Sequence, residues 1–235
     1  MTWLRVRSGV LACGLALAAS GPAQAGDPRQ PTVVELFTSQ SCSSCPPANA
    51  NLITLAERPD VLALSYAVTY WNHLDWEDTF SRPEFTARQR AYAPALGHDA
   101  VFTPQMVVNG RADAIGNRLE PVEALIAANA LAGPPEVRVA DGRVAIGAGD
   151  APAGGADVWL VRYDPNRVEV PVGSGENGGR TLPHSHVVRG LARIGGWDGA
   201  PTTLALPAAP DGLRTAILVQ SPEGGPILAA ATDEG

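Results

Sequence analysis

The sequence contains no lysine, and only three of its 235 residues are cysteine. All seventeen basic residues are arginines scattered along the chain, and twenty-four acidic residues give a formal net charge of −7. Because nucleic-acid binding depends on clustered positive charge, the absence of a basic run argues against a nucleic acid as partner. An acidic surface of this kind favours solubility without indicating a ligand.

The sequence also lacks an apolar run long enough to span a bilayer. Arg5 and Arg7 precede a short apolar run over 10–19, and Ala23-Gln24-Ala25 has the small-x-small pattern of a signal-peptidase site. We therefore predict that residues 1–25 are a signal peptide and that the mature protein is periplasmic or secreted, with no membrane span after cleavage. An uncleaved anchor and a lipid-bearing Cys13 are the alternatives.

After cleavage the remaining cysteines are Cys42 and Cys45, in the motif Cys-Ser-Ser-Cys. Helical spacing over 45–58 places the pair at the start of a helix, whose unpaired N–H groups stabilise a thiolate. We interpret Cys42 as the nucleophile and Cys45 as the thiol that closes the disulfide. This predicts thiol–disulfide exchange without a cofactor, on a protein or small-molecule thiol or disulfide.

Two other interpretations of the pair remain open. A structural disulfide across four residues restrains the unfolded chain by roughly 2 kcal/mol, against about 4 for a loop of some sixty residues. The second is a metal site, in which the two thiolates bind zinc or Cu(I). His184 and His186 are the candidate additional ligands, although no metal ligand is assigned.

Apolar runs alternate with segments of helical spacing in the first half of the chain. The predicted strands are 32–38, 61–68 and 101–109, and the predicted helices are 45–58, 83–96 and 120–131. This alternation predicts an α/β domain over 26–133. After Pro135 short strands and turns predominate, with a hairpin signal at Asp141-Gly142. We predict a separate small all-β domain, sandwich-like, over 134–235.

Three further parts of the sequence bear on the cysteine pair. Thr103-Pro104 interrupts the strand 101–109, which indicates an edge strand, a bulge or a cis turn. The glycine-rich segment 173–180 lacks the Lys-Ser/Thr ending of a phosphate-binding loop. One hypothesis is that this segment packs near the thiols and contacts them through Glu176, Asn177 and Arg180. Trp71 and Trp76 either cover the cysteine pair or form the core of an inserted lid.

A strand, a CxxC motif opening a helix, and Thr-Pro before another strand together resemble the thioredoxin superfamily. The resemblance implies a thioredoxin-like fold with a helical insert. It also implies that Thr103, Pro104 and Gln105 bind an extended substrate beside the cysteines. A non-catalytic module on this scaffold, binding copper or a protein, is the competing function.

The runs ELFTSQSCSSCPPA, TPQMVVNGR and GENGGRTL are more closely similar to a family of secreted bacterial thioredoxin-like proteins of uncharacterised function. This resemblance covers nearly the whole mature chain. The chain departs from that family at Ala67 and Thr69, where His and Asp are usual, and at His186, where Asn is usual. Glu35 is then the remaining carboxylate candidate to take the proton of Cys45.

Overall fold

The structure, a computed structural model, describes residues 1, 30–131 and 133–233. The predicted signal peptide, apart from Met1, lies outside the described residues, as does Cys13. No helix in the described part of the chain is long and apolar enough to cross a membrane.

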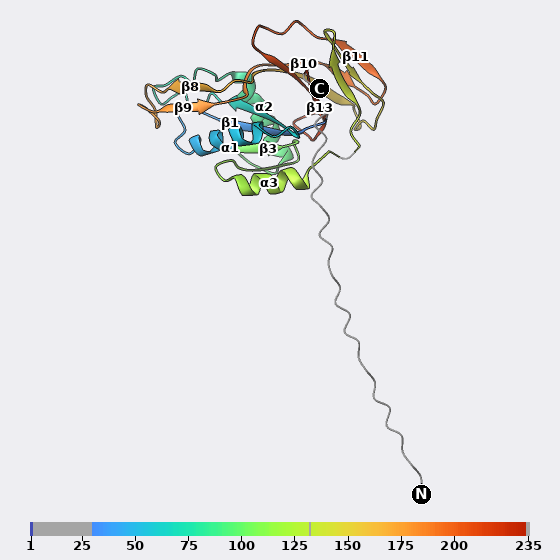
Figure 1. The fold of residues 1–235 in the computed structure, drawn as a ribbon, viewed down its shortest axis with the longest axis horizontal. Coiled ribbons are helices and arrows are strands. Elements are labelled where there is room, and N and C mark those ends of the chain that lie inside the picture. The colour runs from blue at the N-terminus through green and yellow to red at the C-terminus, as the bar shows by residue number, and fades with distance from the viewer. Residues whose placement is uncertain (2–29, 132, 234–235) are drawn as a thin grey trace.

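One mixed sheet of eight strands runs through the molecule in the order β13-β12-β7-β10-β2-β1-β3-β4 (Figure 1). Its strands from the first half of the chain are β1 (Thr32–Thr38), β2 (Val61–Ala67), β3 (Gln105–Val108) and β4 (Ala112–Ile115). Its strands from the second half are β7 (Ala156–Asp164), β10 (Val187–Trp197), β12 (Arg214–Gln220) and β13 (Ile227–Thr232). The two groups meet where β10 runs parallel to β2, and the Ser65 N–H donates to the His186 carbonyl at 2.9 Å.

Three short helices cover the first half of this sheet. They are α1 (Pro46–Ala56), α2 (Pro83–Ala95) and α3 (Leu119–Ala128). Because side chains alternate along a strand, Val34 and Leu36 of β1 pack with α1 and α3, whereas Val33 and Phe37 pack with α2 on the opposite face. The cysteine motif therefore lies on the α1 side of the sheet.

The remaining strands form two smaller sheets. β5 (Val137–Ala140), β6 (Arg143–Ile146) and β11 (Thr202–Ala205) form a three-stranded sheet. It packs on the second half of the main sheet through Val144 and Ile146 against Ile217. β8 (Val168–Pro171) and β9 (Thr181–His184) form a hairpin of their own, which lies beside α1 (Figure 1).

The predicted fold class was wrong. The chain is mostly β, and it is not a thioredoxin-like α/β domain with a helical insert followed by a small all-β domain. The physical reason is β10, which pairs with β2 and so joins strands of the second half to the sheet of the first. Residues 69–80 form turns and irregular structure without a helix. The domain limits 26–133 and 134–235 stay a prediction.

Candidate functional site

The cysteine motif forms a tight turn between β1 and α1. The Cys45 N–H donates to the Cys42 carbonyl at 3.1 Å, and the N–H groups of Ala48 and Asn49 donate to the Cys45 carbonyl. Cys45 is thus the N-cap residue of α1, as the helical spacing predicts. Both cysteines are free thiols, and they are only 1% and 0% exposed, although the two serines between them are exposed. The motif reaches the surface while its sulfur atoms do not.

Several donors surround the Cys42 sulfur. The Cys45 thiol is the strongest of the influences that lower the pKa of Cys42, to about 6, and burial opposes it. The Ser44 hydroxyl lies 3.2 Å from the sulfur, and the Thr103 hydroxyl donates to it at 3.4 Å. Trp71 Nε1 donates to the same Thr103 oxygen at 2.8 Å. Since the indole occupies a lone pair of this oxygen, the Thr103 hydrogen is left to point at Cys42.

The environment of Cys45 acts in the opposite direction. Burial raises the pKa of Cys45 well above its ordinary value, and the neighbouring Cys42 raises it further. The nearby Thr38 hydroxyl lowers the pKa of Cys45, without overcoming burial. A thiolate is therefore favoured on Cys42, and a protonated thiol on Cys45. A nucleophile followed by a resolving thiol requires these protonation states.

The predicted substrate-binding residues differ in their contacts. The Thr103–Pro104 peptide bond is cis, and Thr103 contacts Cys42 directly. Pro104 is buried, and its carbonyl accepts from the Gly116 N–H at 3.0 Å. The Gln105 side chain is held away from the thiols, because its Oε1 accepts from Gln89 Nε2 and its Nε2 donates to Asp113 Oδ2, each at 2.9 Å. Substrate binding by these three residues stays a prediction.

Residues 173–180, between β8 and β9, form a cover loop over the cysteine motif. The Glu176 carboxylate accepts from the Ser43 N–H at 2.8 Å, and this bond lowers the pKa of Glu176. Asn177 is fully buried, and its Nδ2 donates to the carbonyls of Gln40 and Cys42 at 3.0 and 2.8 Å. Arg180 contributes indirectly, because it donates to Asn177 Oδ1. The hypothesis that this segment packs near the thiols is confirmed.

Gly175 lets the cover loop approach this closely. Its φ of +75° favours glycine, and a Cβ placed there would lie 2.9 Å from the Ser41 hydroxyl oxygen. On the neighbouring side of the motif, Trp76 donates to Gln40 Oε1 at 2.9 Å and packs under Gly173. Trp71 and Trp76 thus lie at the cysteine motif without belonging to an inserted helix.

The two candidate histidine ligands do not converge on the cysteines. The His184 ring nitrogen Nδ1 lies 3.5 Å from the amide nitrogen of Asn49, and the ring packs edge-on against Phe80. His186 instead stacks on Tyr163, with ring centroids 5.4 Å apart. Across the residues that the structure describes, no three His, Cys, Asp or Glu side chains are grouped to hold a metal ion.

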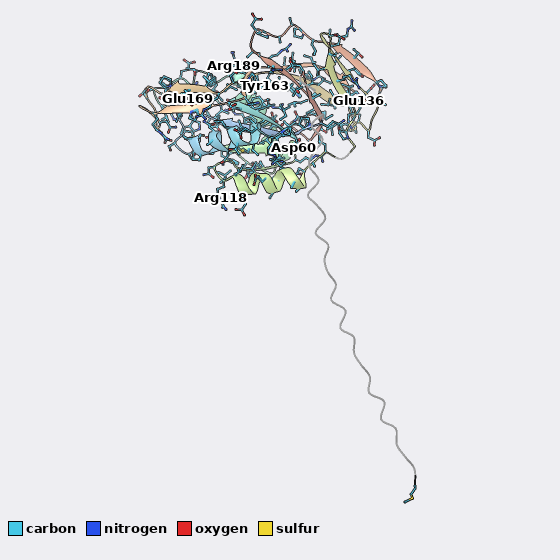
Figure 2. The ribbon with its side chains drawn as sticks, in the orientation of Figure 1. Asp60, Arg118, Glu136, Tyr163, Glu169 and Arg189 are labelled. Atoms are coloured by element: carbon cyan, nitrogen blue, oxygen red, sulfur yellow. The ribbon has the colours of Figure 1, made fainter. Side chains whose placement is uncertain are left out.

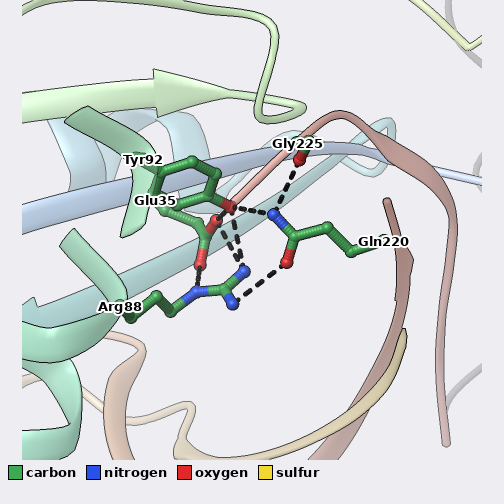
Figure 3. A network of polar contacts seen from close by, with 5 residues as sticks. All are labelled: Glu35, Arg88, Tyr92, Gln220 and Gly225. Atoms are coloured by element: carbon green, nitrogen blue, oxygen red, sulfur yellow. Dashed lines mark hydrogen bonds and ion pairs between the residues drawn. The ribbon is translucent and has the colours of Figure 1, made fainter. Parts of the chain in front are cut away.

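Glu35 lies on the wrong face of β1 to serve the thiols. Its carboxylate is fully buried and accepts from Arg88 Nε and Nη2, at 2.6 and 3.0 Å, and from the Tyr92 hydroxyl (Figure 3). Gln220 of β12 accepts from Arg88 and donates to the Tyr92 hydroxyl. The Arg88 guanidinium packs over the Trp159 ring, with its central carbon 5.6 Å from the ring centroid. This network joins the two halves of the chain on the α2 face.

Sequence reasoning missed Thr38 and Asn49. The Thr38 hydroxyl donates to Asn49 Oδ1 at 2.9 Å, and both side chains are buried next to Cys45. The spacing of Cys45 and Asn49, four residues apart on a predicted helix, was the available signal, since such residues share a face. Nothing in the local sequence indicated the contact of Asn49 with His184.

Comparisons with known proteins find similarity along most of the chain. The crystal structure of protein AGR_C_4864 from Agrobacterium tumefaciens is similar, with 34% identity, a TM-score of 0.73, and coverage of 86% of this chain and 92% of that one. HBP35 of Porphyromonas gingivalis shares the fold, with 15% identity, a TM-score of 0.58, and coverage of 88% and 76%. No curated protein matches. Residues 33–220 match the family described as "Protein of unknown function (DUF1223)", and the chain belongs to that family.

Proposed function

We propose that this protein is an exported thiol–disulfide oxidoreductase that works through Cys42 and Cys45. The supporting observation is the opposed environments of the two sulfur atoms, which favour a thiolate on Cys42 and a thiol on Cys45. A thiol at the ordinary value of 9.0 is about 1% ionised at pH 7, whereas a pKa of about 6 makes roughly nine tenths of it thiolate. A merely structural disulfide does not need this difference.

The reaction follows from these protonation states. The Cys42 thiolate attacks one sulfur of a substrate disulfide, a mixed disulfide forms, and the other substrate sulfur leaves as a thiolate that solvent protonates. Cys45 then attacks the Cys42 sulfur, and the second substrate sulfur leaves with the proton that Cys45 gives up. The substrate gains two electrons and the pair becomes a disulfide. In reverse, the oxidised pair oxidises a dithiol.

The burial of Cys42 adds a requirement for this function. A substrate sulfur reaches a side chain that is 1% exposed only after the cover loop moves. The bonds to break are those of Glu176 and Asn177 to the motif backbone. As part of the same proposal, the site follows the pattern of the thioredoxin superfamily, in which a cysteine pair at the start of a helix lies beside a cis proline. Export rests on the signal-peptide pattern of residues 1–25.

A trapping experiment tests the function. The variant Cys45→Ser, reduced and mixed with Ellman's reagent at pH 7, should hold a stable mixed disulfide on Cys42, seen by intact mass and reversed by reductant. Cys42→Ser should form none on the same timescale, because the Cys45 thiol is buried and protonated. The same Cys45→Ser protein, unfolded in urea, shows that the thiol itself is competent. Equal labelling of both folded variants, or none in either, overturns the proposal.

A further inference from the structure

His184 is a buried side chain that the proposed reaction has not used. It is 3% exposed, and among the described residues its Nε2 has no hydrogen-bond partner. Burial, reinforced by the positive charge of Arg189, lowers the pKa of His184 to about 4, so its imidazole is neutral at pH 7. Arg189 itself packs on Phe80 and lies 3.5 Å from Asp164. A neutral histidine has one N–H, on either nitrogen.

A chain of buried polar groups connects this ring to Cys45. His184 Nδ1 faces the Asn49 amide nitrogen at 3.5 Å, and Asn49 Oδ1 accepts from the Thr38 hydroxyl at 2.9 Å. The Thr38 hydroxyl also interacts with Cys45 and lowers the pKa of that thiol, and the Asn49 N–H donates to the Cys45 carbonyl at 3.0 Å. With the hydrogen bonds in this direction, the Thr38 hydroxyl donates its single hydrogen to Asn49. Only a lone pair of its oxygen is then available to Cys45. That arrangement suits a thiol.

When Cys45 is ionised, the hydrogen bonds between Thr38, Asn49 and His184 must run in the opposite direction. To donate to a thiolate, Thr38 must turn its hydrogen away from Asn49, which must then offer its NH₂ group to the Thr38 oxygen. The Asn49 oxygen then faces His184 and needs a donor there, which only the Nδ1–H form of the imidazole supplies. Turning the amide by half a turn exchanges its O and N while the other heavy atoms stay in place.

We propose that His184 is a positioning residue for Cys45, because its Nδ1–H form reverses the chain through Asn49 and Thr38 so that Thr38 donates to the Cys45 sulfur during resolution. The reversal moves one proton from Nε2 and one to Nδ1, with water as the carrier, and the imidazole is neutral before and after. Among the described residues Nε2 lacks a partner in both forms, so its desolvation penalises both and does not select between them. This inference rests on the proposed function and concerns its second step alone.

Ellman's reagent separates the two steps, because Cys42 attack and Cys45 attack each release one chromophore. His184→Leu should slow the second release by about tenfold, the effect of one lost hydrogen bond to a charged group, and leave the first unchanged. His184→Asn keeps a polar atom near the Nδ1 position and should restore most of the rate. His186→Asn, two residues away and outside the chain, should alter neither release.

Thr38→Val removes the last link of the chain and should slow the same step. Because both substitutions break one chain, Thr38→Val with His184→Leu should be no slower than the slower single variant. The proposal is wrong if His184→Leu slows both releases alike, if it slows neither, or if the double variant shows additive effects. Failure of the proposed function is distinct, since the first release would then be absent in the unsubstituted protein.

Discussion

Trp71 determines where the hydrogen of Thr103 points. Its indole N–H occupies a lone pair of the hydroxyl oxygen, and this leaves the Thr103 hydrogen free to donate to Cys42. Removing the hydroxyl with Thr103→Val should raise the pKa of Cys42 by about one, the equivalent of a hydrogen bond worth about 1.4 kcal/mol. Iodoacetamide labelling as a function of pH measures this pKa.

The sign of the pH dependence follows from the lowered pKa. In the unsubstituted protein, labelling should increase as pH rises through about 6 and level off above it, since the thiolate is the reactive form. The thiolate also stabilises the reduced protein above the ordinary thiol pKa, a contribution lost as pH falls through about 6. Thr54→Val, on the exposed side of α1, is the matched control. An unchanged midpoint in Thr103→Val would show that the hydroxyl is not a significant donor.

Among the elements, we expect the cover loop to control access to Cys42, because it is hydrogen-bonded to the backbone of the motif. Asn177→Ala removes two hydrogen bonds to the motif backbone and leaves the Gln40 and Cys42 carbonyls without them. Each bond contributes about 1 kcal/mol, so losing both should make the open form more populated, on the order of thirtyfold. Labelling by a bulky polyethylene-glycol maleimide should therefore accelerate much more than labelling by iodoacetamide.

Glu169→Gln is the control for this substitution, because Glu169 lies on β8 of the same hairpin and bonds the exposed Arg167 (Figure 2). It should leave both labelling rates as they are. If Asn177→Ala also leaves the maleimide rate unchanged, then the cover loop does not limit access to Cys42.

Elements with a regular pattern could be predicted from the sequence, and those with an interrupted pattern could not. The buried run 32–38 and the helix after Cys45 have the predicted place and type. β10 was missed, although it joins the two halves, because Gly190, Gly195 and two register shifts remove the alternation that marks a strand. Ser81 and Glu84 have the spacing of a capping box, but Arg82 is the N-cap residue of α2 and the Ser81 hydroxyl donates to the Asp78 carbonyl.

The residues of the candidate site also differ in whether the sequence could predict their places. The Cys-Ser-Ser-Cys pair and Thr103 belong to short motifs, and spacing along the chain was enough to place them. Glu35 was misjudged because its partner Arg88 lies 53 positions away, and alternation along β1 does not reveal which helix covers which face. Contacts of such long sequence separation depend on the tertiary fold, which the sequence pattern did not predict.

At the scale of the whole molecule, the turn between β12 and β13 fastens the end of the chain to α2. A Cβ on Gly224 would lie 2.3 Å from the Ala91 carbonyl oxygen, and its φ is +72°. Gly224→Ala should therefore destabilise the protein by about 3 kcal/mol. Gly212 has a similar φ, +77°, with no atom within 4 Å of the Cβ position, so Gly212→Ala should cost only about 1 kcal/mol.

Urea unfolding of both variants measures this difference. Because one sheet and the Arg88 network connect the halves, tryptophan fluorescence and circular dichroism should report a single shared transition. Equal losses in the two glycine variants would contradict the close packing of the turn on α2. Two separate transitions would show that the halves unfold independently, as the predicted limits 26–133 and 134–235 imply.

An open sheet also has two outer strands, and here they are β13 and β4. β13 packs against β5 of the smaller sheet, whereas β4 follows β3 at the other end of the order. β4 is only four residues long and carries Asp113, whose carboxylate is already bonded by His98 and Gln105. A short border strand with a charged residue is a poor template for another chain. The β4 end of the main sheet is therefore a poor site for edge-to-edge pairing.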